Sequence, residues 1–454
     1  MNLKQNLLVG IFSFLIPGIA FAQSTGNQLS SNLTAFGAIK AGSADGLVPA
    51  YSGGLAVMRN LPSASPATGY PDPFADEKPI FVVSKDNMQK YVSMLTPGEQ
   101  ALLMRFGSEG FKMNVYPSHR TMSYPQWVLD NTAKNIKTAS LTADGEGVTG
   151  AYGGIPFPAP ANGYQVMWNS FLAYQPAYCQ QQFQNFLVES NGDVTQLGTI
   201  AVKWAEPYYF KNADQLQNSF YRYYLVRYLT PVAEAGETYL FQYPIDFNNS
   251  NDVTYFYSPG TRRIRLAPDF RYDTPISSYG GAIDYDEIDL FYGSMDKFDF
   301  KLVGEKEMIV PYNDYTMGNT SQDAVLDKNF INPSAVRWEV HRVWVVEATL
   351  KSGERHAFSR WDFYVDEDSW HVLATESYDH AGNIYKVGFA YPWENYSQGD
   401  ASAMAHTFGI YDLSKGDYEL SYVQARGDGF WQCSVDAPNM SNFTGQAIVA
   451  QAIR

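Results

Sequence analysis

The sequence is poor in cysteine, histidine and basic residues. Its 454 residues hold two cysteines, six histidines and 32 Lys+Arg against 47 Asp+Glu, a formal net charge of −15 at pH 7. Nucleic acid is therefore an unsuitable partner, because phosphate binding requires a concentrated basic surface. Long apolar runs are also missing beyond the amino-terminal stretch, and a membrane helix needs roughly 20 apolar residues. We expect a soluble mature chain.

Catalytic signatures are missing too. There is no HExxH zinc helix, no G-x-S-x-G elbow, no Walker loop and no CxxC pair. Some histidines lie in or beside expected strands, where pairing could gather a metal site, but polar strand-face residues are the favoured interpretation. We expect no catalytic residue, no metal and no cofactor. The six histidines are His119, His341, His356, His371, His380 and His406.

The stretch DYDEIDLF holds four carboxylates whose spacing could bind calcium. It lacks the glycine and the terminal glutamate of an EF-hand loop, so a solvated acidic turn is the favoured interpretation. Paired carboxylates for acid/base catalysis stay open, because any acidic protein offers many such pairs. The four carboxylates are Asp284, Asp286, Glu287 and Asp289.

The chain begins MNLKQNLLVGIFSFLIPGIAFAQ, which predicts a secretory signal peptide cut after Ala22. Its apolar run is too short for a membrane anchor. Removal of Lys4 leaves 31 basic against 47 acidic residues, a net charge of −16. The expected location is periplasmic, which is oxidising, so the even count of two favours a disulfide between Cys179 and Cys433. A pair of buried thiols is the alternative.

Residues 23–176 are rich in loops and helices. Ser84 can cap a helix with one apolar face, and Thr96-Pro97-Gly98-Glu99 is a capping box with proline at the first helical position. The stretch GAYGGIPFPAPANG must be a shaped loop. Asn162 then caps a helix with a wide aromatic stripe. We expect these helices to form a cover packed as one unit with residues 177–454.

Residues 177–454 alternate short aromatic and β-branched runs with turn residues, which is typical of an antiparallel meander. The clearest part is 336–391, where one strand face is apolar and rich in tryptophan. The predicted fold is α+β: an open, incomplete antiparallel β-barrel with helices that cover its hydrophobic concave face.

Aromatic residues make up 15% of the chain, including 33 tyrosines. They supply apolar area with a polar edge, which suits a cavity for a hydrophobic ligand. The alternative is that β-rich proteins carry many aromatic residues in any case. The candidate ligand-binding wall consists of Trp168, Phe171, Leu172, Trp344, Trp361 and Phe363.

Four ordered motifs, GLVPAYSGGL, YPSHRTMSYPQWVLDNT, GAYGGIPFPAPANG and YSPGTRRIRLAPDFRYDTP, extend over the mature chain. They resemble a family of proteobacterial secreted proteins that is described as a domain of unknown function or as outer-membrane lipoprotein-sorting-like. The family is similar in fold to the periplasmic lipoprotein carriers of the Lol system. The resemblance implies transport of lipids or other hydrophobic molecules to or from the outer membrane. It also implies an exporter of the resistance-nodulation-division type and outer-membrane proteins as partners. It offers no catalytic residue to carry over.

The last motif places several arginines together in an acidic protein. On the strand expected after Pro259-Gly260, Arg263 and Arg265 share one face. Such a pair either neutralises the protein's own carboxylates, of which Asp269 and Asp273 are nearest, or grips an anionic head group or a partner surface. The internal ion pair is the favoured interpretation, and ligand binding stays open.

The sequence thus predicts a periplasmic carrier or chaperone for a lipid or another hydrophobic small molecule. The first alternative is an envelope hydrolase acting on a lipid, which a compact Ser/His/Asp or metal cluster beside the cavity would favour. The second is an outer-membrane β-barrel, for which aromatic belts and alternation are also expected. The helices expected at 84–106 and 162–174 argue against it.

Overall fold

The computed structural model describes residues 29–54, 64–250, 253–267, 272–398, 401–424 and 429–452. The expected signal peptide, residues 1–22, lies outside the described residues, as do Asp269 and Arg271. In the described part, no helix is both long and apolar enough to cross a membrane.

Sixteen of the described strands form one sheet. The first meander runs β5-β6-β7-β8-β9-β10, with β5 Tyr178–Val188, β6 Val194–Ala205, β7 Phe220–Thr230, β8 Thr238–Pro244, β9 Val253–Ser258 and β10 Arg263–Leu266. The second runs from β11 to β17, with β11 Phe298–Pro311, β12 Trp338–Leu350, β13 Arg360–Asp366, β14 Val372–Tyr378, β15 Ile384–Gln398, β16 Ala401–Asp412 and β17 Asp417–Gln424. All pairings within these meanders are antiparallel.

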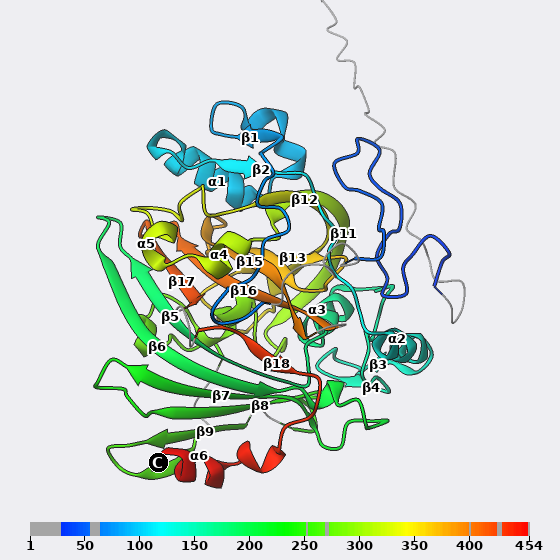
Figure 1. Cartoon of the computed structure of the whole chain (residues 1–454), viewed down its shortest axis with the longest axis vertical. Helices are drawn as coiled ribbons and strands as arrows, with labels where there is room; N and C mark the ends of the chain where they lie inside the picture. The colour runs from blue at the N-terminus through cyan, green and yellow to red at the C-terminus, as the bar shows by residue number, and fades with distance from the viewer. Residues whose placement is uncertain are drawn as a thin grey trace, which may run out of the picture.

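The two meanders join where β17 pairs with β5, and the sheet stays open because β10 ends it on one side. On the other side β12 pairs with β11 and, through one parallel bridge, with β2. The remaining strands are short: β1 Phe81–Val83 and β2 Met113–Val115 at the far edge, β18 Gln432–Ser434 on β5, and the separate pair β3 Ser140–Leu141 and β4 Val148–Thr149. The predicted open antiparallel fold is confirmed (Figure 1).

Helices pack on this sheet from several parts of the chain. The α-helices are α1 Pro97–Phe106, α2 Gln126–Thr138, α3 Gly163–Phe171, α4 Tyr315–Asn319, α5 Gln322–Val325 and α6 Gly445–Ala452. The 3-10 helices are η2 Met88–Lys90, η3 Val92–Met94, η4 Gly107–Glu109, η5 Pro207–Tyr209, η6 Ser277–Tyr279, η7 Tyr285–Leu290 and η8 Met440–Asn442. Helix α1 contacts β14 and β15, α3 contacts β11 and β12, and α6 contacts β8, β9 and β10.

Two of the three predicted helix caps are present. Thr96 accepts from the Glu99 backbone while the Glu99 carboxylate accepts from the Thr96 backbone, so the capping box opens α1. Asn162 accepts from the Gln165 backbone and opens α3. The helix predicted after Ser84 is wrong, because this stretch forms only the single turns η2 and η3. There the Asn87 side chain bonds the backbone of Ser84 and of Val82, which competes with helical hydrogen bonding.

A crossover segment, residues 272–293, contains η6 and η7 and lies between the two meanders in the chain. Because β10 ends one edge of the sheet and β11 begins near the other, the chain must cross the sheet to connect them. It does so over the concave face, where η6 contacts β6 and η7 contacts β14 and β15. The cover of the first meander therefore comes from inside the β-rich part of the chain, in addition to the amino-terminal helices.

The disulfide expected from the cysteine count is formed. Cys179 on β5 and Cys433 on β18 are bonded, with their Cα atoms 4.1 Å apart and a sequence separation of 254. The bond fixes the carboxyl-terminal segment to the strand at which the two meanders meet. Beyond it, Phe443 and Ile448 cover Leu225 and Leu240 on the outer face of β7 and β8.

Candidate functional site: a two-chamber cavity under the crossover segment

Strand alternation gives β7 and β8 one apolar outer face and one inner face rich in tyrosine. On β7 the inward set is Arg222, Tyr224, Val226 and Tyr228, and on β8 it is Tyr239, Phe241 and Tyr243. The intervening Tyr223, Leu225 and Leu240 pack outward beneath α6. Period-two alternation in a curved sheet thus places the tyrosines on the concave side.

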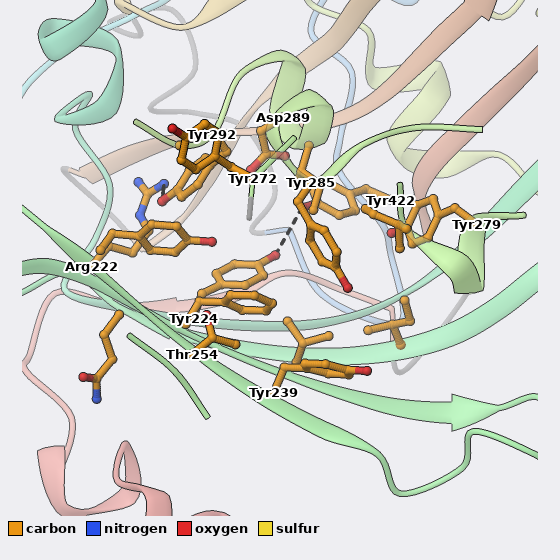
Figure 2. A pocket seen from close by; sticks show the side chains of 18 of the residues that line it. Arg222, Tyr224, Tyr239, Thr254, Tyr272, Tyr279, Tyr285, Asp289, Tyr292 and Tyr422 are labelled. Carbon is orange, nitrogen blue, oxygen red and sulfur yellow. Dashed lines mark hydrogen bonds between the residues drawn. The ribbon is translucent and has the colours of Figure 1, made fainter. Parts of the chain in front are cut away.

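The first chamber lies between this inner face and the crossover segment (Figure 2). It encloses about 990 Å³ of empty space when its open mouth is included, and the centre of a water molecule can reach about 90 Å³ of it. Nine tyrosines line it: Tyr224, Tyr228, Tyr239, Tyr243, Tyr272, Tyr279, Tyr285, Tyr292 and Tyr422. Phe183, Ile200, Phe241, Ile276 and Ile288 add purely apolar surface.

Several of these tyrosine hydroxyls are tied to the protein. Tyr228 bonds Ser278 at 2.9 Å, and Tyr279 accepts from the Asn185 amide at 2.5 Å. Tyr272 donates to the Asp296 carboxylate. Burial also raises the pKa of Tyr224 and of Tyr279 above the ordinary value, so these phenols stay neutral. With the hydroxyls held in this way, the ring faces are the surface that the chamber offers to a ligand.

A second chamber adjoins the first and encloses about 820 Å³ of empty space when open solvent is included. Five junction residues line both chambers: Arg222, Tyr224, Asp289, Tyr292 and Tyr422. Away from this junction the second chamber has a mixed wall. Its polar lining residues include Gln175, Gln181, His371 and His406, and its apolar ones include Phe171, Ala173, Trp204, Phe291, Leu373 and Trp431. The two spaces are therefore neighbours with a shared wall of side chains.

Arg222 connects the sheet to the crossover segment. Its Nε donates to Glu206 at 2.5 Å, and its Nη1 donates to the Tyr292 hydroxyl at 2.5 Å. The guanidinium also lies over the Tyr292 ring, 5.3 Å from its centroid. Burial raises the pKa of Glu206 to about 7, although the neighbouring Arg222 favours the ionised carboxylate. Glu206 therefore balances the charge of Arg222 only to the extent that this carboxyl is ionised.

The other charged junction residue, Asp289, pairs with His406 at 3.2 Å. Burial and the nearby His406 lower the pKa of His371 to about 3, so His371 is neutral. Its Nδ1 then donates to the Ser369 carbonyl and its Nε2 accepts from the Gln175 amide, both at 3.2 Å. Within the described part of the chain, no serine or threonine hydroxyl donates to a ring nitrogen of His371 or His406.

Two junction residues, Asp289 and Tyr422, and the neighbouring Leu290 have a strained backbone. Asp289, Leu290 and Tyr422 all have positive φ, at 52°, 69° and 64°. Positive φ is uncommon for residues other than glycine and is most unusual for a bulky side chain. Strain of this kind persists only where the surroundings fix it, and it often marks a binding site.

The residues predicted to form the ligand wall lie in different places. Phe171 lines the second chamber. Trp168 is buried beside it and donates to the Gly145 carbonyl, while Leu172 is buried next to α3. Trp361 and Phe363 pack together against Phe291 in the core, and Trp344 stacks on Trp370. Apart from Phe171, the predicted wall residues line neither chamber; these are Trp168, Leu172, Trp344, Trp361 and Phe363.

The arginines of the last motif, YSPGTRRIRLAPDFRYDTP, also differ from the favoured interpretation. Arg263 and Arg265 are exposed on the edge strand β10, and in the described part neither makes an ion pair. Arg265 lies over the Phe256 ring at 5.0 Å. Asp273, one expected partner, pairs with Lys297 instead, and Asp269 lies outside the described residues. The predicted ion pair with Asp273 is therefore wrong, because the crossover segment carries Asp273 towards Lys297.

The acidic stretch is also not a solvated turn. Asp286 and Glu287 are each 2% exposed; Asp286 bonds His356 at 2.9 Å and Glu287 bonds Lys386 at 2.6 Å. The reason is that η7 packs against β14 and β15, from which Lys386 reaches the crossover segment. This stretch anchors the crossover segment, which forms the roof of the cavity, to the second meander.

The tyrosines of the chamber were missed as candidates by the sequence reasoning. The alternating stretch FYRYYLVRYLT, which became β7, carried a usable signal, since every second residue from Arg222 to Tyr228 faces the chamber. The contribution of the crossover segment had no periodic signal, because it depends on long-range placement.

With the geometry described, the class is clear: an open antiparallel half-barrel with an aromatic cavity under a crossover segment. The chain belongs to the family described as protein of unknown function (DUF1329), whose model matches residues 82–449. It is 32% identical over 399 residues to the uncharacterized protein PA3922 of Pseudomonas aeruginosa, covering 86% of this chain and 85% of that protein.

Solved structures to which the chain is similar include proteins from three bacteria. A DUF1329 family protein from Desulfovibrio piger matches with a TM-score of 0.42 and 13% identity, covering 63% of this chain and 97% of that one. A putative outer membrane lipoprotein-sorting protein domain from Vibrio parahaemolyticus matches with a TM-score of 0.41 and 11% identity, covering 63% of this chain and 97% of that one. A LolA superfamily protein from Nitrosomonas europaea matches with a TM-score of 0.34 and 8% identity, covering 63% of this chain and 98% of that one.

Proposed function

We propose that this protein is a carrier that binds a lipid or another hydrophobic small molecule in the first chamber. The observation that carries the proposal is the open, tyrosine-lined space between the inner face of β7 and β8 and the crossover segment. Ligand sites are typically concave, mostly apolar and equipped with a few fixed polar groups. The ring faces would hold the apolar body of the ligand, and the junction residues would contact its polar end.

The size of the chamber bears on the mechanism. One water needs roughly 10–15 Å³ of the space open to its centre, so 90 Å³ holds several waters or a slim ligand. A bulky lipid therefore requires the crossover segment to move away from the sheet, and the contact between Arg222 and Tyr292 resists that movement. Entry and release would accordingly occur by displacement of the crossover segment.

The cellular setting is part of the proposal. The signal-peptide-like start and the family resemblance support a periplasmic protein that moves its ligand to or from the outer membrane. An exporter of the resistance-nodulation-division type and outer-membrane proteins are the proposed partners. The exposed Arg263 and Arg265 on the edge strand β10 are the proposed contact with an anionic partner surface.

A lipid hydrolase is the competing function, and the Asp289–His406 pair is the feature that favours it. A hydrolase of this kind also needs a hydroxyl or thiol within hydrogen-bond reach of the histidine. The described residues offer no such contact at His406, so binding without catalysis is the better-supported function.

The test is to purify the protein from its native envelope without detergent and to identify what it carries. Native mass spectrometry followed by solvent extraction should yield one lipid-like molecule per chain. Incubation of the loaded protein should return this molecule unchanged, whereas steady hydrolysis would favour the enzyme. Empty extracts, together with no binding of a fluorescent apolar probe such as N-phenyl-1-naphthylamine, would contradict the carrier function.

A further inference from the structure

A second polar centre lies away from both chambers, where β12 passes the hairpin turn between β13 and β14. His341 on β12 and Asp366 and Asp368 at the turn are all buried, with side chains at most 1% exposed. Each offers one ligand atom, and the three atoms lie within 4.8 Å of one another. None of the three residues lines either chamber.

Asp366 has one satisfied oxygen and one unsatisfied oxygen. Its Oδ2 accepts from the Tyr312 hydroxyl at 3.0 Å and from the Ser369 backbone and hydroxyl at 2.9 and 2.7 Å. Its Oδ1 is buried without a hydrogen-bond partner in the described part of the chain. A buried carboxylate oxygen in this state costs free energy unless a cation or a donor lies beside it.

His341 presents a ring nitrogen to that oxygen. Its Nε2 lies 2.9 Å from Glu339, a carboxylate that fixes Nε2 as the donor, and its ring stacks on Tyr312 at 3.8 Å. Nδ1 therefore faces Asp366 Oδ1 as a second acceptor, 4.0 Å away. This distance is too long for a direct hydrogen bond, so a shared proton cannot join the two atoms.

The arginines nearby are already engaged. Arg120 forms a bidentate pair with Asp368 at 2.8 and 2.6 Å and also contacts Glu367 at 3.1 Å. Arg342 contacts Glu307 and Glu367, and Arg337 contacts Glu77 and Glu339. Among the residues that the structure describes, no arginine pairs with Asp366. The region holds three arginines against seven acidic side chains: Glu77, Glu305, Glu307, Glu339, Asp366, Glu367 and Asp368.

We propose that His341 Nδ1, Asp366 Oδ1 and a carboxylate oxygen of Asp368 bind one divalent transition-metal ion of the class to which Zn²⁺ belongs. A histidine whose other nitrogen is held by a carboxylate is the usual arrangement for a zinc ligand. Ligands at about 2.1 Å in a tetrahedral site lie about 3.4 Å apart, so the 4.0 Å separation closes with a shift of about half an ångström. The mixed nitrogen and oxygen donors favour Zn²⁺ or Mn²⁺ over Ca²⁺ or Mg²⁺.

The experiment uses the full mature chain, purified without chelators, and measures its metal content by inductively coupled plasma mass spectrometry. We expect about one zinc or related ion per chain. Removal with EDTA should lower Tm, and return of Zn²⁺ alone should raise it by about 3 °C or more. A chain that holds no metal and shows no shift in Tm with Zn²⁺, Mn²⁺ or Ni²⁺ would show that only water fills the gap, and would overturn the proposal.

Matched variants place the ion. Asp366→Asn should lose the metal and the Tm shift, whereas Asp362→Asn, on the same strand and paired with Arg360, should retain both. Equal zinc in the two variants would mean binding elsewhere and would overturn the proposal. If Asp366→Asn does not fold, Co²⁺ in the wild-type chain decides: visible bands of a low-symmetry site with a nitrogen ligand support the proposal, and the spectrum of aqueous Co²⁺ overturns it.

Discussion

Arg222 donates a 2.5 Å hydrogen bond from Nη1 to the hydroxyl of Tyr292, which joins strand β7 to the crossover segment across the junction of the two chambers. Glu206 accepts a hydrogen bond from Nε of the same guanidinium, also at 2.5 Å. The inner face of the sheet and the crossover segment are therefore connected through the partly buried guanidinium of Arg222, and the strength of this contact should govern how readily the crossover segment moves away.

Tyr292→Phe should loosen the roof. The change removes only the hydroxyl and leaves a partly buried Arg222 donor unsatisfied, which costs at most about 1–3 kcal/mol of unfolding free energy. We expect an apolar probe to dissociate several-fold faster, as measured by stopped-flow fluorescence. The control is Tyr255→Phe on β9, whose hydroxyl bonds no described residue. Equal dissociation rates in the two variants would mean that Tyr292 does not hold the roof.

Val226→Trp should block the first chamber. Val226 faces the chamber between Tyr224 and Tyr228, so an indole there occupies ligand space while the outer face of β7 is unchanged. Probe affinity should fall at least tenfold, with Tm within a few degrees of the wild type. The same change at Val232, which is 93% exposed, is the control and should leave affinity unchanged. Full binding by Val226→Trp would place the ligand site outside this chamber.

Short-range features of the fold followed from the sequence. The capping box at Thr96, the Asn162 cap and the strands between 336 and 391 depend on neighbouring residues and on periods of 3.6 or 2, which the sequence displays directly. The helix predicted after Ser84 is wrong for an equally local reason, because the side chain of Asn87 bonds backbone groups that a helix would use.

The cavity depends on long-range relations that periodicity does not contain. Strand β17 pairs with β5 across more than two hundred residues, and only that pairing defines a concave face. The aromatic stripe on α3 illustrates the limit: Trp168 is buried against Tyr221 and Phe247, while Phe171 reaches the second chamber. Both positions satisfy the same helical pattern, so the pattern cannot separate core from ligand wall.

Replacing Cys179 and Cys433 with serine should lower stability markedly. The bond closes a loop with a sequence separation of 254 residues. In the chain-entropy model, a loop of that length contributes about 5 kcal/mol. Urea unfolding of the double variant and of the reduced wild type should show the same loss, with single serine variants as controls. Identical midpoints for oxidised and reduced protein would contradict a stabilising disulfide.

Replacing Arg263 and Arg265 with glutamine should leave folding nearly unchanged. Both side chains are exposed, and the contact of Arg265 with Phe256 contributes about 0.5–1 kcal/mol at most. Binding to anionic vesicles or to an envelope partner should weaken, and the weakening should diminish at high salt because the contact is electrostatic. Lys301→Gln, an exposed change on β11, is the charge control. A loss of several kcal/mol in the double variant would indicate internal carboxylate partners instead.

Glu146→Gln should remove part of the pH dependence of stability. Burial raises the pKa of Glu146 to about 7 from an ordinary 4.5, while Ser294 and Met295 donate to one oxygen and the other has no described partner. Between these two values the folded chain keeps a proton that the unfolded chain releases, so stability falls as pH rises from about 4.5 to 7 and then levels off. The loss amounts to at most about 3 kcal/mol. Urea unfolding at pH 5 and pH 8.5 should therefore show a smaller decrease for Glu146→Gln than for the wild type, whereas Glu354→Gln, an exposed control, should match the wild type. A decrease of equal size in all three proteins would mean that Glu146 is ionised in the folded chain at pH 5.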